Sequence, residues 1–548
     1  MRLYQIFTRL YGNTVERPVP NGSRAQNGCG TLDDLTETAL ARIAGLGFTH
    51  IWLTGLIDHA TTTDYADLGL PPATASITKG RAGSPYAIRN YFDLAPDLAR
   101  YPARRWQAFE ACLARIHAAG LKLLVDFVPN HTAREYRPGQ GTNPAAQDTR
   151  RPGFYPDNFY FYLDGGLKLP FAPDYKELPA RATGNDAFTP TPTEQDWYET
   201  VKVNYGQDPR SGRAHLEGPP RTWRFMAEVL QFWAGKGVDG FRCDMVDMVP
   251  VPFWQWALAQ AKAAHPHLLF VGESYQPHNY EPLFAAGFDL LYDKVGLYDA
   301  LLHRLQGKAD TGAIGKALWD TRGQDRRLLR FTENHDEPRL PSTALLGKTL
   351  PATTAFFVTA VVGRQLMVYA GQEVGEPGQD QEGFSGPDGK TSIFDYWSVA
   401  SLRRHCNQGR WDDAALLPAE RQTLEAYRQI LALHARLEAE RLERLYNLQT
   451  ANPQGYGAAA LNDGLALLML PAHSATAPLL AVANFTPRLE RFTIRIPPEA
   501  GVAFPTALED WLHLSDAEAF SDVHLLPDGG FAVSATLGAY GCWACRLP

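Results

Sequence analysis

The feature that most constrains the fold is a regular alternation of short apolar runs with helical stretches over the first two thirds of the chain. The runs 48–56 (FTHIWLTGL) and 121–131 (LKLLVDFVPNH) have the length and bulk of buried strands. Between them, apolar side chains recur at helical spacing, at Trp106, Phe109, Leu113 and Ile116. A strand, a helix and a second strand in this order predict parallel pairing of the two strands.

The same unit repeats along the chain. Further apolar runs occur in VDGFRCD, HLLFVGES, RLLRFTENHDE and FFVTAVVGRQLMVYAGQE, and weaker ones in LYQIFTRLYG and FDLLYDKVG. The count comes to about eight strands, the number in a closed (β/α)8 barrel. We therefore predict an α/β protein built on a (β/α)8 TIM barrel, and an open doubly wound sheet is the structural alternative.

Two parts of the chain break the alternation. Residues 132–203 are rich in Pro, Gly, Asn and aromatic residues and are too long for a simple connection. After residue 442, short runs such as LALLML and RFTIRI, separated by turn residues, are typical of an antiparallel β-sandwich. We predict four segments, namely a first barrel part (1–131), a B domain inserted after the third strand (132–203), a second barrel part (204–442) and a C-terminal β-sandwich (443–548).

The composition excludes several classes of protein. The net charge of −8, with no run of Lys or Arg, gives no electrostatic footprint for nucleic acid. No apolar run reaches the roughly 18 residues that a membrane span needs. The first residues lack the basic head and long apolar stretch of a secretory leader, so we expect a cytoplasmic protein with no membrane partner.

Four of the predicted strands end in clusters of polar residues. The clusters hold Asp126, Asn130 and His131, then Arg242 and Asp244, then Glu273, and finally His335 and Asp336. Because a barrel binds its ligands at the carboxyl ends of the strands, we expect these side chains to meet at one face. A single such residue is usually a cap or a salt-bridge partner, but several carboxylates buried together are costly unless they are paired or functional.

Carboxylates and an arginine, without a thiolate cluster or a phosphate loop, suit chemistry on a glycosidic bond. A retaining glycosidase uses an ionised carboxylate as nucleophile and a protonated acid about 5 to 5.5 Å away. Alternate residues of a strand share a face, so Arg242 should lie beside Asp244 and keep it ionised by lowering its pKa. Glu273 ends an apolar run, and we expect desolvation to raise its pKa.

In this order, the four segments resemble the signature regions of the alpha-amylase family of retaining glycoside hydrolases (glycoside hydrolase family 13). The resemblance covers essentially the whole chain and implies a (β/α)8 barrel with an inserted B domain and a C-terminal β-sandwich. By motif position it implies that Asp244 is the nucleophile, Glu273 the general acid/base and Asp336 the carboxylate that stabilises the transition state. It also implies substrate-binding roles for Tyr86, Asp126, His131, Arg242 and His335.

Two departures from the family pattern bear on substrate and cofactor. Many alpha-amylases carry a Lys-His pair shortly after the nucleophile, where this sequence has Asp247 and Met248. That replacement weakens the prediction of an ordinary endo-acting amylase. The same His often contributes to a calcium site together with an asparagine at the position of Asn130. We therefore expect no required cofactor, with a calcium site doubtful and its ligands unknown.

The sequence predicts a retaining enzyme that acts on α-glucosidic bonds, mainly α-1,4, of an α-glucan or malto-oligosaccharide. If a sugar hydroxyl replaces water as the acceptor, the same residues make a maltosyl- or glucanotransferase. An inactive amylase-like scaffold or binding protein is an alternative from another class, which the presence of all three carboxylates disfavours. The aromatic residues between 154 and 161 fit either sugar platforms or the core of the inserted domain.

Overall fold

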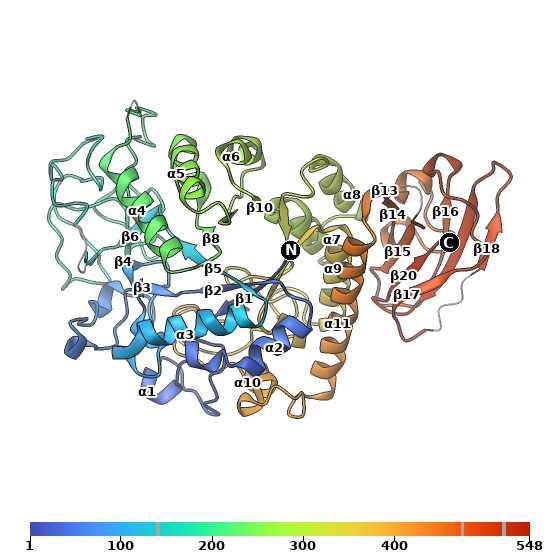
Figure 1. Cartoon of the computed structure of the whole chain (residues 1–548), viewed down its shortest axis with the longest axis horizontal. Helices are drawn as coiled ribbons and strands as arrows, with labels where there is room; N and C mark the ends of the chain where they lie inside the picture. Colours follow the sequence, from blue (N-terminus) through green and yellow to red (C-terminus); the bar gives the residue numbers. More distant parts are fainter. Residues whose placement is uncertain (139–142, 217, 473–475, 518–521) are drawn as a thin grey trace.

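Eight parallel strands form a closed barrel in the middle of the molecule (Figure 1). The computed structural model describes residues 1–138, 143–216, 218–472, 476–517 and 522–548. The barrel strands, in chain order, are β1 (Arg2–Phe7), β2 (His50–Thr54), β5 (Lys122–Phe127), β8 (Gly240–Cys243), β9 (Leu269–Gly272), β10 (Leu290–Tyr292), β11 (Leu328–Arg330) and β12 (Gln365–Tyr369). The predicted barrel is confirmed and the open sheet is wrong, because β1 pairs in parallel with both β2 and β12.

Helices surround the barrel (Figure 1). They are α1 (Arg24–Asn27), α2 (Glu37–Gly45), α3 (Arg105–Ala118), α4 (Arg221–Gly235), α5 (Val251–Ala264), α6 (Tyr280–Ala286), α7 (Asp299–Leu305), α8 (Thr311–Asp320), α9 (Thr349–Val362), α10 (Ala400–Cys406) and α11 (Pro418–Ala439). In helix α4, Met226, Val229, Leu230 and Trp233 recur at helical spacing and are fully buried. Within the described residues, no helix is long and apolar enough to cross a membrane.

Apolar side chains fill the interior of the barrel. Leu3, Trp52, Leu124, Leu329 and Met367 come from five different strands and belong to one buried cluster. A filled interior leaves no channel, so polar side chains can gather only where the strands end.

One predicted strand is shorter than its apolar run. The run from Phe356 to Glu373 divides into the last turns of α9 and the separate strand β12. Every residue of α9 from Pro351 to Val362 is buried. A helix without a polar face shows no helical period, so its sequence cannot be told from that of a buried strand.

The chain leaves the barrel after β5 and rejoins it at α4. In this interval β6 (His131–Ala133) pairs antiparallel with β7 (Thr200–Lys202). Another antiparallel ribbon, β3 (Ile57–His59) with β4 (Ile88–Leu94), lies earlier in the chain, after β2. The side chains of Phe159, Tyr160 and Phe161 are buried, so these three aromatic residues form core rather than exposed sugar platforms.

Two antiparallel sheets form the C-terminal part, at the far end of the long axis from the segment inserted after β5 (Figure 1). The five-stranded sheet has the order β13 (Leu442–Asn447), β14 (Gly464–Pro471), β15 (Leu479–Asn484), β20 (Cys542–Arg546) and β17 (Glu509–Leu514). The three-stranded sheet has the order β16 (Glu490–Ile496), β19 (Phe531–Leu537) and β18 (Asp522–Leu525). The predicted β-sandwich is confirmed, since Val482 and Trp543 of one sheet share a buried cluster with Phe492 and Val533 of the other.

The three central strands of the five-stranded sheet, β14, β15 and β20, are buried on both faces. The second face of the sheet contributes Leu467, Ala481 and Ala544 to the main core, which also includes apolar residues of α9 and α11. Helix α11 stands between the barrel and this sheet (Figure 1). The three-stranded sheet instead ends in the largely exposed edge strand β18 and the exposed turn 527–529.

Candidate active site

Arg242 on β8 lies at the centre of a cluster of carboxylates at the carboxyl ends of the barrel strands. Its side chain is fully buried. Nη1 lies 2.7 Å from Asp244 Oδ1, and Nη2 lies 2.7 Å from Glu273 Oε1. Asp126 Oδ1 and Asp336 Oδ2 lie 3.8 and 4.0 Å from the same guanidinium. The structure thus brings together four of the predicted acids around one cation.

Aromatic groups complete the surroundings of this guanidinium. Arg242 Nε donates to Tyr292 Oη at 3.3 Å, and Cζ lies 5.0 Å from the ring centre of Trp52. A buried cation is costly unless it is paired, and here carboxylates and ring faces supply the pairing. The interior of the barrel therefore fixes the position of Arg242.

Glu273 follows β9 and accepts hydrogen bonds on both oxygens. The amide of Met245 donates to Oε2 at 2.8 Å, and the hydroxyl of Tyr275 donates to Oε1 at 2.8 Å. Met245, directly after Asp244, has a φ of +45°. A left-handed conformation is strained for a residue with a side chain. This strained turn aims a backbone amide at Glu273.

The protonation of Asp244 differs from the prediction. Burial and the nearby charge of Glu273 raise the pKa of Asp244, and Arg242 opposes them. Arg242 lowers this pKa as predicted, but burial and Glu273 outweigh its effect, so the net shift is upward and not downward. The reason is geometric, because Arg242 contacts both carboxyls at 2.7 Å and favours the anion of either one.

His335 and Tyr86 form the opposite part of the cluster. Their rings stack with centres 5.3 Å apart and planes at 25°. Gln5 Nε2 lies 2.8 Å from His335 Nδ1, and His335 Nε2 lies 3.2 Å from Asp336 Oδ2. Burial and the charge of Arg242 lower the pKa of His335, so the ring is neutral, accepts at Nδ1 and donates at Nε2.

Asp126 and Asp336 differ in how much solvent they meet. Asp126 is buried and accepts from the amide of Gly55 at 3.2 Å. Burial raises the pKa of Asp126 to about 6, against the charge of Arg242. The side chain of Asp336 is 36% exposed, so this carboxylate reaches the open face of the cluster. Burial also raises the pKa of Asp336.

A cavity of about 320 Å³ opens above the cluster. Five predicted residues line it, namely Tyr86, His131, Asp244, Glu273 and Asp336. The other three, Asp126, Arg242 and His335, are not in this lining, and they contact the residues that are. The geometry thus separates side chains that can touch a ligand from those that position them.

Other residues line the cavity that the sequence analysis did not predict. The inserted segment contributes Trp197, whose ring centre lies 5.4 Å from that of His131. It also contributes Glu199, which pairs with Lys79 at 3.0 Å. Tyr275 also lines the cavity, and it lies two residues after Glu273, beyond the end of β9. Trp197 lies outside regular structure and gave no periodic signal.

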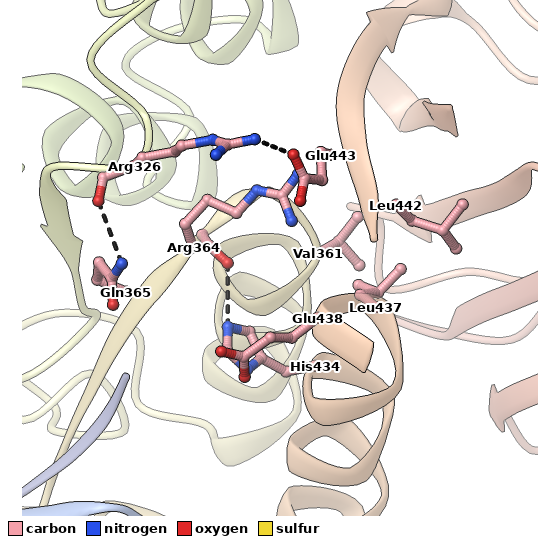
Figure 2. Close-up of a pocket in the computed structure, with 10 residues that line it drawn as sticks. Arg326, Val361, Arg364, Gln365, His434, Leu437, Glu438, Leu442 and Glu443 are labelled. Carbon is pink, nitrogen blue, oxygen red and sulfur yellow. Dashed lines mark hydrogen bonds and ion pairs between the residues drawn. The ribbon is translucent and has the colours of Figure 1, made fainter. Parts of the chain in front are cut away.

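A second cavity of about 190 Å³ lies at the opposite end of the barrel, where β12 begins (Figure 2). Arg326 is paired with Glu443, and His434 Nε2 lies 3.0 Å from the carbonyl oxygen of Gly363. None of the predicted site residues lines this cavity. Its charged groups hold α11 and β13 to the barrel, which is a structural role.

The chain is similar in sequence to known proteins. A model described as "Alpha amylase, catalytic domain" matches residues 5–265. The chain is 26% identical to Alpha-amylase MalA of Haloarcula japonica over 390 residues, which are 69% of this chain and 44% of that protein. It is 27% identical to the Alpha-1,4-glucan:maltose-1-phosphate maltosyltransferase of Rhodospirillum rubrum over 254 residues, which are 40% of this chain and 36% of that protein. The matches thus span less than half the length of these relatives.

Solved structures of similar fold cover nearly the whole chain. The alpha-amylase from H. orenii has a TM-score of 0.63 at 18% identity and covers 100% of this chain and 99% of its own. The debranching enzyme from Nostoc punctiforme has a TM-score of 0.65 at 15% identity, and the match covers 99% of this chain and 97% of that enzyme. At such identities the structures show a shared fold alone. By its matched catalytic-domain segment and its fold, the chain is therefore similar to proteins of the alpha-amylase family.

Proposed function

We propose that the protein is a retaining glycosidase that cleaves α-glucosidic bonds, mainly α-1,4, of α-glucans or malto-oligosaccharides. The observation that carries this proposal is the buried guanidinium of Arg242, which holds Asp244 and Glu273 beside one cavity that Asp336 also lines. A paired carboxylate site of this kind is what retaining glycosidases require. The names of the relatives, an alpha-amylase among them, support the same substrate class.

In the proposed reaction, Asp244 attacks the anomeric carbon while the bond to the leaving oxygen breaks. The proton of the Glu273 carboxyl passes to that oxygen, and a covalent glycosyl-enzyme remains. Glu273, now ionised, takes a proton from water, whose oxygen attacks the anomeric carbon and releases Asp244. The net result is hydrolysis with retention of configuration.

The reaction needs one proton on the pair formed by Asp244 and Glu273. The charge of Glu273 disfavours the charge of Asp244, and Arg242 balances one negative charge. One proton on the pair therefore gives the acid and the nucleophile at once. The hydrogen bonds of Glu273 leave its carboxyl fixed in place during the transfer.

The remaining cavity residues would hold the sugar. Tyr86 presents its ring, which His335 supports by stacking, and Asp336 presents a partly exposed carboxylate. His131 carries a neutral ring, because burial lowers its pKa to about 3. These groups offer one apolar face, one charged acceptor and one neutral donor or acceptor to sugar hydroxyls.

Transglycosylation is a second candidate function. Several relatives are named maltosyltransferases, including those of Rhodospirillum rubrum and Pseudomonas aeruginosa. The three carboxylates serve either acceptor, because the covalent intermediate is the same. Exclusion of water from the cavity by the inserted segment would decide between them.

The test is a time course of products from maltoheptaose, repeated with added maltose as acceptor. We expect shorter chains alone from a hydrolase and chains longer than maltoheptaose from a transferase. Asp244→Asn and Glu273→Gln should each lower kcat by about 10⁴-fold. Glu425→Gln, an exposed position on α11, serves as the control and should retain activity. Full activity in either site variant would contradict the proposal.

We also propose a cytoplasmic location. All six cysteines are free, and five of them are buried. Unpaired cysteines are typical of a reducing compartment. Cell fractionation with an antibody against the protein would test the location.

A further inference from the structure

Lys202 of β7 places an ammonium group among oxygen atoms from three separate segments. Its side chain is only 5% exposed. Nζ lies 2.6 Å from Asn130 Oδ1, 2.8 Å from Asp186 Oδ1 and 3.2 Å from the carbonyl oxygen of Met248. An ammonium group has three donors and no acceptor, and here it meets three acceptors.

The oxygen atoms around Lys202 are held in place by other contacts. Asn130 is fully buried, and its Nδ2 donates to the carbonyl oxygen of Gly184 at 2.8 Å, which turns Oδ1 toward Lys202. Met248 ends the short helical turn that follows Asp244. Burial lowers the pKa of Lys202, and the Asp186 carboxylate opposes that shift. The three segments therefore form a preformed site for one positive charge.

A calcium ion at Asn130, the position at which many alpha-amylases contribute an asparagine to such a site, does not fit these residues. Calcium takes six to eight oxygen ligands at about 2.3 to 2.6 Å. An ion bound by Asn130, Asp186 and Met248 would occupy the volume of Lys202 Nζ. In the parts of the chain that the structure describes, no group of three or more His, Cys, Asp and Glu side chains is arranged to hold a metal.

We propose that the ammonium of Lys202 is the structural cation of this site and takes the place of calcium. It ties the inserted segment, through Asp186, to the segment that carries His131 and to the turn that follows Asp244. The edge of the active-site cavity is therefore held by a covalent part of the chain and needs no metal. This inference stands whether or not the proposed reaction is correct.

The first test uses the unaltered protein. Thermal unfolding is measured after dialysis against EDTA and again with 1 mM calcium chloride, and calcium binding is measured by calorimetry. We expect the same Tm in both solutions and no calcium binding. A Tm that falls in EDTA, or one calcium ion bound per chain, would overturn the proposal.

The second test removes the charge. Lys202→Met keeps the length of the side chain and should lower Tm by about 5 to 10 °C, since it leaves the half-buried carboxylate of Asp186 and the buried Asn130 oxygen without their donor. Lys176→Ala, an exposed lysine of the same segment, is the control and should leave Tm unchanged. Adding Asp186→Asn to Lys202→Met should lower Tm little further, because both substitutions remove the same ion pair. The proposal would be overturned if the two substitutions lowered Tm by fully additive amounts, or if Lys202→Met left Tm unchanged.

Discussion

At the scale of single residues, the structure places charged groups where burial and pairing compete. Arg242 is paired with two carboxylates, so its burial is balanced. Glu382 has no such balance, since its Oε2 is buried without a hydrogen-bond partner and Asp380 and Asp395 add negative charge nearby. Burial raises the pKa of Glu382 to about 9.

This shift predicts a pH dependence of stability for Glu382. The unfolded chain releases the proton above about pH 4.5, while the folded protein retains it up to about pH 9. Ionisation of Glu382 therefore does not affect the free energy of unfolding below pH 4.5. Between those limits it lowers the free energy of unfolding by about 1.4 kcal/mol for each pH unit. The free energy of unfolding of Glu382→Gln should equal that of the parent near pH 4.5 and be several kcal/mol larger at pH 8.

Urea denaturation of both proteins at pH 5, 6, 7 and 8 measures this difference. Glu110→Gln, an exposed position on α3, is the matched control and should follow the parent at every pH. Parallel curves for Glu382→Gln and the parent would show that Glu382 is not protonated in the folded protein.

At the scale of elements, loops after neighbouring strands fix one another. Asp247, in the turn after β8, accepts from Ser274 Oγ at 3.0 Å, from the amide of Tyr275 at 2.8 Å and from Asn279 Nδ2 at 2.9 Å. Ser274 and Tyr275 directly follow Glu273. Asp247 therefore acts as a positioning residue for the segment that carries the proposed acid.

We expect Asp247→Asn to lower kcat by about 10-fold to 100-fold, because it weakens three hydrogen bonds to a charged acceptor. KM should change less than kcat, since Asp247 is not part of the cavity lining. Steady-state kinetics on maltoheptaose measure both constants. Asp67→Asn, an exposed position, is the control. A large rise in KM with unchanged kcat would point to substrate binding instead.

Elements with a clear helical period, and short apolar runs between such elements, could be predicted from the sequence, whereas a long apolar run with no polar face could not be assigned. Strands β2 and β5 follow from compact apolar runs between helical stretches, and the polar residues at the strand ends indicated the site. Helix α9 lies partly within the apolar run that predicts a strand, because its buried surface has no polar face. Trp197 and Lys202 were missed because their roles depend on how the inserted segment folds back on the barrel.

At the scale of the whole molecule, the helices around the barrel and the five-stranded C-terminal sheet share one apolar core. Leu467 of β14 is buried in the same cluster as the residues of α9 and α11. Separating the two parts would expose this face to water at a cost of roughly 25 cal/mol for each Å² of apolar surface. The two parts should therefore unfold together.

Leu467→Ala should lower the free energy of unfolding by about 2 to 5 kcal/mol, the usual cost of a cavity in a core. Differential scanning calorimetry should show one transition, moved as a whole to lower temperature. Leu525→Ala on β18 is the matched control, because this leucine is 63% exposed and should change the transition little. Two transitions, of which one moves, would show that the parts unfold separately.

The edge strand β18 has a practical consequence for protein engineering. The turn 527–529 between β18 and β19 is exposed and belongs to neither face of the five-stranded sheet. A fluorescent domain or an affinity peptide inserted in this turn would contact neither the shared core nor the cavity above Arg242. This turn is therefore the position at which such a reporter should be inserted.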